Sequence, residues 1–417
     1  MTPVPSDAHD RIEQPDLNLG FMPLIDCAPL VVALERGFFA EQGLRVNLSR
    51  EVSWANIRDK VAAGTLDGAQ MLAPLPLAAS LPEPVAGVPM LTALSLGLNG
   101  NVIGVSTRLH AAMAALASTP GEGGSGARLA RVAWRRREQG RPLRLGVVFP
   151  YSSHNYLLRY WLAAHGLHPD RDVHLDVVPP PFMVEALAAG EIEGFCVGEP
   201  WGSLAMAQGA GVVLLADHAV WRHHPEKVFA VTEAWAAGHP ATHRALLIAL
   251  LKAAQWLEAR GHDGALAELL AREDYVGVPA PLVRQILAGV AGPVFFRYAA
   301  TFPWRSHALW FLTQMARWGQ IDMALPLRPL AGRVYRPDLY REAAAALGLA
   351  CPLVDDKPEG GHETEYPLAE ASGPLTLGAD RFCDGRRFDP RDPIGYLSDG
   401  QPWDRRVAPG DWRRGGA

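Results

Sequence analysis

Residues 60–72 read KVAAGTLDGAQML, and residues 186–198 read ALAAGEIEGFCVG. Both stretches follow the same order: the end of a helix, the letters AAG, a polar and an apolar residue, an acidic residue before glycine, and an apolar strand. A helix that stops at glycine and leads into a short buried strand is typical of strand–helix–strand units with parallel strands. The repeat therefore indicates two similar α/β lobes.

Strands and helices alternate on both sides of each repeated stretch. We expect Ser53 to cap the helix that Gly64 ends, and Ser152 or Ser153 to cap a helix that ends at Gly166. In the first half we expect strands at Leu17–Gly20, Leu44–Leu48 and Gly68–Leu72, and a helix at Pro29–Gly37. In the second half we expect strands at 143–150, 173–181 and 193–200, and a helix at 182–192.

Three further segments differ in composition from the two repeats. Residues 119–143 begin Gly/Ser-rich and end Arg-rich, which indicates a linker followed either by a patch for an acidic partner or, as we favour, by a solvated basic helix. The chain after Thr232 is mostly helical. Beyond Cys351 it is rich in Pro, Gly, Asp and Arg, so we expect a tail that wraps the surface or stays partly disordered.

Bulk composition excludes several classes of function. The formal net charge is −5, which argues against nucleic acid as a direct partner. The four cysteines form no CxxC pair, and the sequence holds no GxGxxG, GxxxxGK[ST], HExxH or GxSxG motif. We therefore expect a protein that is not an enzyme and that carries no cofactor.

The N-terminus reads MTPVPSDAHDRIEQPDLNLGF and lacks the basic start and apolar run of a secretory signal. No later stretch of 18 or more uninterrupted apolar residues indicates a membrane-spanning helix. We expect a cytoplasmic protein with no membrane partner. A start further upstream that adds an export signal is the alternative.

Four side chains lie in loops or at the ends of elements where ligands of α/β proteins are expected. Trp54 offers an indole N–H and Asn101 an amide. His154 stands in the first turn of a helix, where anions bind, and Lys227 brings a positive charge. Each has an ordinary alternative: a packed core tryptophan, a turn asparagine, a capping or surface histidine, and a solvated lysine. Together they match a small oxyanion, which needs several N–H donors and one compensating charge.

Two carboxylates flank this set of residues. Glu199 and Glu226 lie close in sequence to the apolar strands that carry it. Either acid orients Lys227 or forms an ion pair at a helix end, and an ordinary surface acid is the third possibility.

The motifs, taken as a set, resemble the nitrate/bicarbonate-binding family of periplasmic-type solute receptors. The resemblance spans about residues 16 to 395 and implies a two-lobed periplasmic-binding-protein-like clamshell (type II) with two crossover segments, a helical C-terminal part and an irregular tail. On that basis we expect a first lobe of residues 16–108 with 233–350, a linker or insert at 109–143, a second lobe at 144–232 and a tail at 351–417. The segments that carry the resemblance are GFMPLIDCAPLVVALERGFFAEQGL (20–44), SWANIRDKVAAGTLDGAQMLAPLPL (53–77), FPYSSHNYLLRYWLAAHGLHPDRDV (149–173), VVPPPFMVEALAAGEIEGFCVGEPW (177–201), HPEKVFAVTEAW (224–235), HALWFLTQMARWGQ (307–320) and FCDGRRFDP (382–390).

The resemblance implies that the family's nitrate contacts fall on Trp54, Asn101, His154 and Lys227. Asn101 stands where the family has glutamine, a departure that keeps the amide and shortens the side chain. In bicarbonate-binding relatives an acid replaces the lysine and helps to hold a calcium ion. Lys227 therefore favours nitrate or nitrite without a metal, and Lys227→Glu is expected to abolish binding with the fold intact.

Pro180 and Val197 match positions near the family's pocket. The motifs SSHNYLLRYW and LNGN also resemble those of the NasS-like branch of nitrate/nitrite sensors, whose members lack an export signal. That branch implies a protein partner, a NasT-like RNA-binding antiterminator with an ANTAR domain, which the sensor holds and releases when nitrate or nitrite closes the lobes. The rival interpretations are a nitrate receptor of an ABC transporter and an enzyme acting on a small nitrogen compound.

Overall fold

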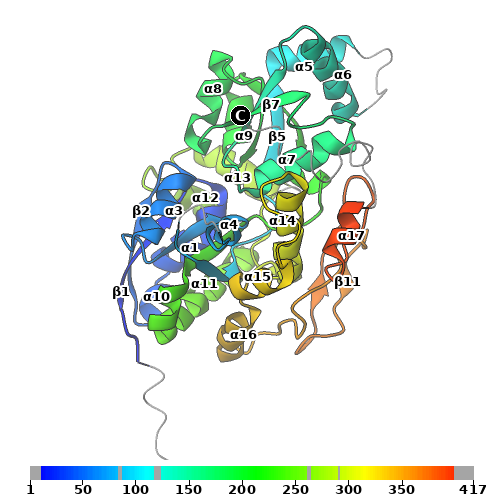
Figure 1. Ribbon diagram of the computed structural model, residues 1–417. Helices are drawn as coiled ribbons and strands as arrows, with labels where there is room; N and C mark the ends of the chain where they lie inside the picture. Colours follow the sequence, from blue (N-terminus) through cyan, green and yellow to red (C-terminus); the bar gives the residue numbers. More distant parts are fainter. Residues whose placement is uncertain (1–10, 83–86, 117–123, 261–263, 290–291, 399–417) are drawn as a thin grey trace, which may run out of the picture.

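Two lobes, each built on a five-stranded sheet, make up the protein (Figure 1). The structure is a computed structural model that describes residues 11–82, 87–116, 124–260, 264–289 and 292–398. Two similar α/β lobes were the main expectation from the repeated stretches, and the fold class is confirmed.

The first sheet has the strand order β2-β1-β3-β10-β4. β1 pairs in parallel with β2 and β3, whereas β10 is antiparallel to both β3 and β4. The central strand β3 is buried along its whole length, as expected for a strand covered on both faces. The strands are β1 (Asp16–Phe21), β2 (Arg45–Arg50), β3 (Gly68–Leu72), β4 (Met90–Ser95) and β10 (Lys227–Thr232).

The second sheet repeats this plan in the order β7-β6-β8-β5-β9. β6 is parallel to β7 and β8, and β5 is antiparallel to β8 and β9. In each sheet the antiparallel fourth strand is the one that the chain enters directly after crossing from the other lobe. The strands are β5 (Asn101–Ser106), β6 (Leu143–Val147), β7 (Val173–Val177), β8 (Gly194–Gly198) and β9 (Gly211–Ala216).

Two strands lie in the opposite lobe from the one we expected. Residues 101–106 were assigned to the first lobe, but β5 pairs with β8 and β9 of the second sheet. Residues 227–232 were assigned to the second lobe, but β10 pairs with β3 and β4 of the first. Apolar periodicity identifies a strand but not its partner, because the same side-chain pattern suits either sheet.

The chain crosses between the lobes twice, at residues 96–100 between β4 and β5 and at residues 217–226 between β9 and β10. The two crossovers lie side by side. Asn99 N donates to His224 O at 3.0 Å, and Leu98 pairs with Pro225 in an isolated bridge. Both connections therefore form one hinge beside the ends of β5 and β10.

The helix caps and stops expected from the sequence are confirmed. Ser53 Oγ accepts from Asn56 N at 3.1 Å at the start of α3 (Trp54–Ala62), and Ser152 Oγ accepts from Asn155 N at 3.0 Å at the start of α7 (Ser153–Ala164). Gly64 and Gly166 follow these helices with φ of 73° and 82°, a conformation that glycine adopts without steric cost.

The expected insert at 109–143 is mostly helical and packed. The described part holds α5 (Thr107–Ala115) and α6 (Ser125–Glu138), and α6 contacts α7 and β6. Leu129, Val132 and Ala133 of α6 are buried, and three of its five arginines are exposed, whereas Arg136 is half-buried and pairs with Glu193. The basic helix that we favoured is thus present, but it is a layer of the second lobe and not part of a linker.

Helices of the C-terminal half cover the first lobe and join the two lobes. α1, α2 and α16 pack on the long helix α11, and α14 contacts both α15 of the first lobe and α7 of the second (Figure 1). Within the described residues, no helix combines the length and the apolarity that crossing a bilayer requires. The remaining helices are α1 (Ala28–Glu35), α2 (Phe38–Glu41), α4 (Leu75–Ala79), α8 (Met183–Ala189), α9 (Trp201–Ala207), α10 (Glu233–Gly238), α11 (Pro240–Arg260), α12 (Gly264–Leu270), α13 (Ala280–Ala288), α14 (Arg305–Arg317), α15 (Leu327–Val334) and α16 (Pro337–Ala346), with short 3₁₀ turns η1 (Ile25–Cys27), η2 (Pro180–Phe182), η3 (Asp217–Ala219) and η4 (Arg297–Ala299).

The described part of the tail beyond Cys351 contains secondary structure and contributes a side chain to the core. Its described part, up to residue 398, holds β11 (Tyr366–Pro367), β12 (Thr376–Leu377) and α17 (Pro393–Ser398). Phe382 is 1% exposed, and its ring lies 4.8 Å from that of Trp221 and 5.5 Å from that of Tyr160, centroid to centroid. Cys383 N donates to Val220 O at 2.8 Å, so the tail is bonded to the second crossover. Residues 399–417 lie outside the described part.

Candidate functional site

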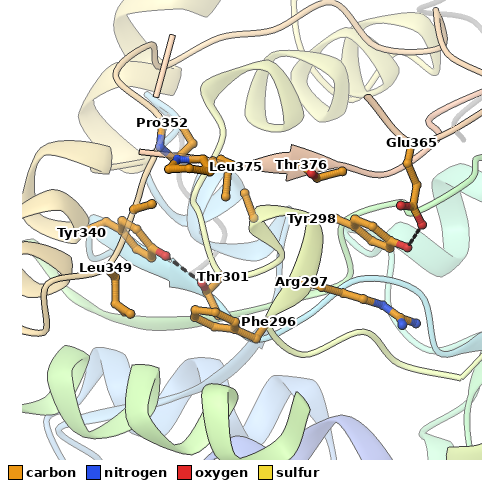
Figure 2. Close-up of a pocket in the computed structure, with 13 residues that line it drawn as sticks. Phe296, Arg297, Tyr298, Thr301, Tyr340, Leu349, Pro352, Glu365, Leu375 and Thr376 are labelled. Carbon is orange, nitrogen blue, oxygen red and sulfur yellow. Dashed lines mark hydrogen bonds between the residues drawn. The ribbon is translucent and has the colours of Figure 1, made fainter. Parts of the chain in front are cut away.

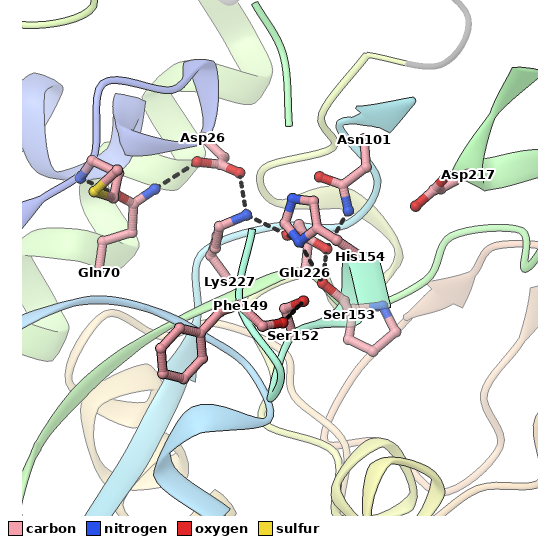
Figure 3. Close-up of polar contacts among 12 residues, drawn as sticks. Asp26, Gln70, Asn101, Phe149, Ser152, Ser153, His154, Asp217, Glu226 and Lys227 are labelled. Atoms are coloured by element: carbon pink, nitrogen blue, oxygen red, sulfur yellow. Dashed lines mark hydrogen bonds and ion pairs between the residues drawn. The ribbon is translucent and has the colours of Figure 1, made fainter. Parts of the chain in front are cut away.

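The four predicted contact residues come from both lobes and meet at the hinge, where Figure 3 labels three of them, Asn101, His154 and Lys227. Trp54 begins α3 and Lys227 begins β10 in the first lobe, while His154 lies in the first turn of α7 and Asn101 begins β5 in the second. All four side chains are at most 1% exposed. The ordinary alternatives of a surface histidine and a solvated lysine are therefore wrong.

Lys227 lies between two carboxylates. Its Nζ donates to Asp26 Oδ2 at 2.9 Å and to Glu226, and it stands 5.4 Å from the centroid of the Trp54 ring. Asp26 also accepts from Gln70 Nε2 at 2.5 Å, which fixes the carboxylate in place. Lys227 thus provides the expected positive charge, but two acids already compensate it.

Glu226 is the centre of the cluster. Its carboxylate accepts from Asn101 Nδ2 at 2.5 Å, from Ser153 Oγ and from Lys227 Nζ. His154 Nδ1 lies 3.4 Å from Glu226 Oε1. Three of the four residues predicted to contact a bound anion, Asn101, His154 and Lys227, therefore lie against this carboxylate.

Burial controls the charges of the cluster. It lowers the pKa of His154 to about 3 and that of His224 to about 4, so both rings are neutral at pH 7. Burial also opposes the charge on Lys227, but Asp26 and Glu226 outweigh it and raise the pKa of the ammonium group. Lys227 is therefore the fixed cation of the cluster.

The two acids beside Lys227 respond differently to the same environment. Burial raises the pKa of Asp26, and the attraction of Lys227 only partly offsets this. Burial would also raise the pKa of Glu226, but His154, Lys227 and the hydrogen bonds to the carboxylate outweigh it and lower the pKa to about 2. Glu226 therefore holds its negative charge more strongly than Asp26 does.

Two buried ring nitrogens have no hydrogen-bond partner among the described residues. Trp54 Nε1 is an N–H donor, and His154 Nε2 is the second nitrogen of a neutral ring that carries a single N–H. A Cβ added at Gly198 would lie 3.6 Å from His154 Nε2 and 3.3 Å from Asn101 Oδ1, so this glycine borders the same space. Because an unpaired buried donor costs about 1–3 kcal/mol, such groups are commonly kept for a ligand.

Sequence reasoning missed several members of this site. Asp26, Gln70 and Ser153 were not predicted as contacts, although Asp26 follows the first parallel strand, which is the same positional signal that we used elsewhere. Of the two flanking acids, Glu226 contacts Lys227, whereas Glu199 accepts from Ser203 N at 2.9 Å at the start of α9. Glu226 thus takes the first of the expected roles, whereas Glu199 forms hydrogen bonds at a helix end and not the expected ion pair among the described residues.

Pro180 and Val197 carry no polar side-chain group. Pro180 begins η2, and Val197 lies in β8 beside Gly198 with its side chain on the opposite face of the sheet. Their assignment to the site stays a prediction.

The arrangement suits binding of an anion better than catalysis. Ser153 Oγ donates directly to Glu226 and lies 3.5 Å from His154 Nδ1, so the histidine is not placed to take the serine proton as in a catalytic triad. Nowhere in the described part of the chain do three or more His, Cys, Asp or Glu side chains group as metal ligands would.

A separate cavity of about 470 Å³ lies between the first lobe and the tail (Figure 2). Thr301 and Tyr340 share a hydrogen bond of 2.8 Å across it, and Tyr298 donates to Glu365 at its rim. None of the residues that line it belongs to the cluster around Glu226. The buried donors of the hinge, which come from both lobes, make the better candidate site.

The amino-acid sequence is similar to a known family and to several proteins of nitrate and nitrite binding or import. Residues 10–271 match the NMT1-like family. The chain is 31% identical over 409 residues to the nitrate/nitrite binding protein NrtA of Nostoc, covering 93% of this chain and 86% of that protein. It is 39% identical over 411 residues to the nitrate import ATP-binding protein NrtC of Synechocystis, covering 93% of this chain and 55% of that protein. The chain thus spans about half the length of the ATP-binding relatives that it matches.

One solved structure and one further sequence relative support the same family. The crystal structure of the periplasmic nitrate-binding protein NrtA from Synechocystis superposes with a TM-score of 0.80 at 28% identity, covering 93% of this chain and 99% of that chain. A bicarbonate-binding protein, CmpA of Synechococcus elongatus, is also 31% identical over 424 residues, covering 95% of this chain and 88% of that protein. The chain belongs to the NMT1-like family, among the nitrate/nitrite- and bicarbonate-binding proteins.

Proposed function

We propose that this protein is a receptor that closes its two lobes on nitrate or nitrite at the hinge cluster. The observation that carries the proposal is the convergence of Lys227 and Trp54 from one lobe with Asn101 and His154 from the other. A planar monovalent anion needs N–H donors around its edge and one positive charge, and charge-assisted hydrogen bonds supply about 1.5–3 kcal/mol each.

Lys227 also favours nitrate or nitrite over bicarbonate held with a metal ion. A cation placed in the cluster would meet the ammonium group, which Asp26 and Glu226 keep charged. The relatives include both nitrate- and bicarbonate-binding proteins, and we propose that Lys227 decides which of these anions this chain binds.

Calorimetric titration of the full chain with nitrate, nitrite and bicarbonate tests the proposal. We expect saturable binding of nitrate or nitrite and none of bicarbonate, with or without calcium. Trp54→Phe keeps the aromatic wall and removes one donor, so the anion should bind about 10- to 100-fold more weakly. Trp134→Phe on α6, where the side chain is 41% exposed, is the matched control and should bind as the unmodified chain does. Binding of bicarbonate alone would refute the choice of anion.

Relatives of this chain include a nitrate/nitrite binding protein and a nitrate import ATP-binding protein. We therefore propose that this chain is the receptor of an ABC transporter. The NasS-like motifs at residues 152–161 and 98–101 favour a second function for the same site. In it, a cytoplasmic sensor releases an ANTAR-type antiterminator when nitrate or nitrite binds. Both uses require only that the partner and the anion prefer different lobe arrangements.

A co-purification experiment separates the two uses. A sensor should hold a NasT-like antiterminator without nitrate and lose it as nitrate is added, because the anion stabilises the closed lobes. Cell fractionation should then place the chain in the cytoplasm. Retention of the antiterminator at saturating nitrate, or no retention at any concentration, leaves the transporter receptor as the function.

A further inference from the structure

The most heavily hydrogen-bonded group in the hinge is the carboxylate of Glu226. We infer that this carboxylate is a built-in anion that takes the place of the external one, so that nitrate or nitrite binds by displacing it. The inference rests on the proposed function, because it deepens the account of the same site. It assigns Glu226 a role in setting affinity and selectivity.

The contacts of Glu226 are those that a bound oxyanion would make. A carboxylate is planar, monovalent and rich in acceptors, as nitrate and nitrite are. Asn101 Nδ2 and Ser153 Oγ reach it from the second lobe, Lys227 Nζ reaches it from the first, and His154 Nδ1 stands 3.4 Å away. These donors include three of the four residues predicted to contact the anion.

The position of Glu226 in the chain makes displacement possible. It is the last residue of the second crossover and directly precedes β10, so it belongs to the hinge and not to the interior of a sheet. Its carboxylate joins donors of both lobes, as a bound ligand would. Movement of this one side chain would therefore free donors of both lobes for an external anion.

Charge balance favours displacement over addition. Lys227 is the cation of the cluster, and Asp26 and Glu226 already face it. His154 and His224 are neutral at pH 7, so an added anion would place a further negative charge beside two carboxylates in a buried site. Uncompensated buried charge is strongly unfavourable. Exchange of one monovalent anion for another leaves the number of charges around Lys227 unchanged.

The exchange also predicts which anions bind. A small planar monovalent anion without an O–H group replaces the carboxylate charge for charge and acceptor for acceptor. Bicarbonate would bring an O–H donor among the donors of the site, and a divalent anion would leave one negative charge in excess. The site should therefore accept nitrate, nitrite and, once Glu226 is removed, formate. It should exclude sulfate.

Calorimetry on the full-length chain carrying Glu226→Ala or Glu226→Gln tests the inference with nitrate and formate as probes. Without the internal competitor, Glu226→Ala should bind nitrate at least tenfold more tightly than the unmodified chain. It should also bind formate, a free carboxylate of matching charge. Asp26 still pairs with Lys227 in both variants, which supports folding. Glu199→Gln, a carboxylate that caps α9 and makes no contact with Lys227 among the described residues, is the matched control and should change neither affinity.

The possible results separate this inference from the proposed function. If the unmodified chain binds nitrate and both variants fold but bind it more weakly and ignore formate, Glu226 only positions Lys227 and the inference is wrong. If the variants bind formate while neither they nor the unmodified chain bind nitrate, the inference holds and the proposed function is wrong. Should Glu226→Ala fail to fold, Glu226→Gln, which has the same size and no charge, decides by its gain or loss of nitrate affinity.

Discussion

Lys227→Met should abolish nitrate binding and lower the free energy of unfolding by about 3–5 kcal/mol. The substitution removes the cation that Asp26 and Glu226 share and leaves two buried carboxylates without compensation. Urea denaturation measures the loss of stability, and calorimetry below the denaturation midpoint measures the loss of binding.

Lys252→Met is the matched control for this experiment. Lys252 pairs with Glu41 at the surface, where removal of an ion pair costs at most about 1 kcal/mol. A folded Lys227→Met variant that keeps its nitrate affinity would show that the anion binds elsewhere. The structure also corrects an expectation from the sequence: Lys227→Glu would not leave the fold intact, because it would place a third carboxylate beside two buried ones.

Phe382→Ala should lower the free energy of unfolding by about 3–5 kcal/mol, although Phe382 lies in a segment whose composition resembles a loose tail. Its ring packs with Trp221 of the second crossover, with Tyr160 of α7 and with Trp310 of α14. Truncation to alanine leaves a cavity between groups that belong to the hinge, the second lobe and the C-terminal helices. Chemical denaturation measures the effect.

Leu353→Ala provides the comparison within the same tail. Leu353 is 59% exposed, so its truncation should change stability by no more than about 0.5 kcal/mol. A loss below about 1 kcal/mol for Phe382→Ala would show that the tail contributes little to the hinge. We expect instead that the tail limits how far the lobes can separate, because it is bonded to the second crossover through Cys383 N and Val220 O.

Local structure was predictable because it depends on neighbours in sequence. Ser53 and Ser152 cap the helices that they were expected to cap, and β3 has the predicted bounds Gly68–Leu72. The tail was not predictable in this way. Its many Pro, Gly, Asp and Arg residues suggest disorder, and only packing against Trp221 and Trp310 shows that Phe382 is a core residue.

The site was predictable in part. The resemblance pointed to Trp54, Asn101, His154 and Lys227, and the structure brings these residues together at one hinge. The resemblance gave no hint that Glu226, the residue next to Lys227, accepts hydrogen bonds from the same donors. A sequence lists an acidic residue without showing whether it points to solvent or into a cluster.

Periodicity and capping act within a few residues along the chain, so the two α/β lobes and the helix ends follow from the sequence alone. Tertiary structure decided which lobe receives β5 and β10, where the tail packs, and which charges Lys227 meets. Strand partners and buried ion pairs join residues that are far apart in the chain, such as Asp26 and Lys227, whose separation is 201 residues. Their energies depend on distance and burial, which only the folded chain sets.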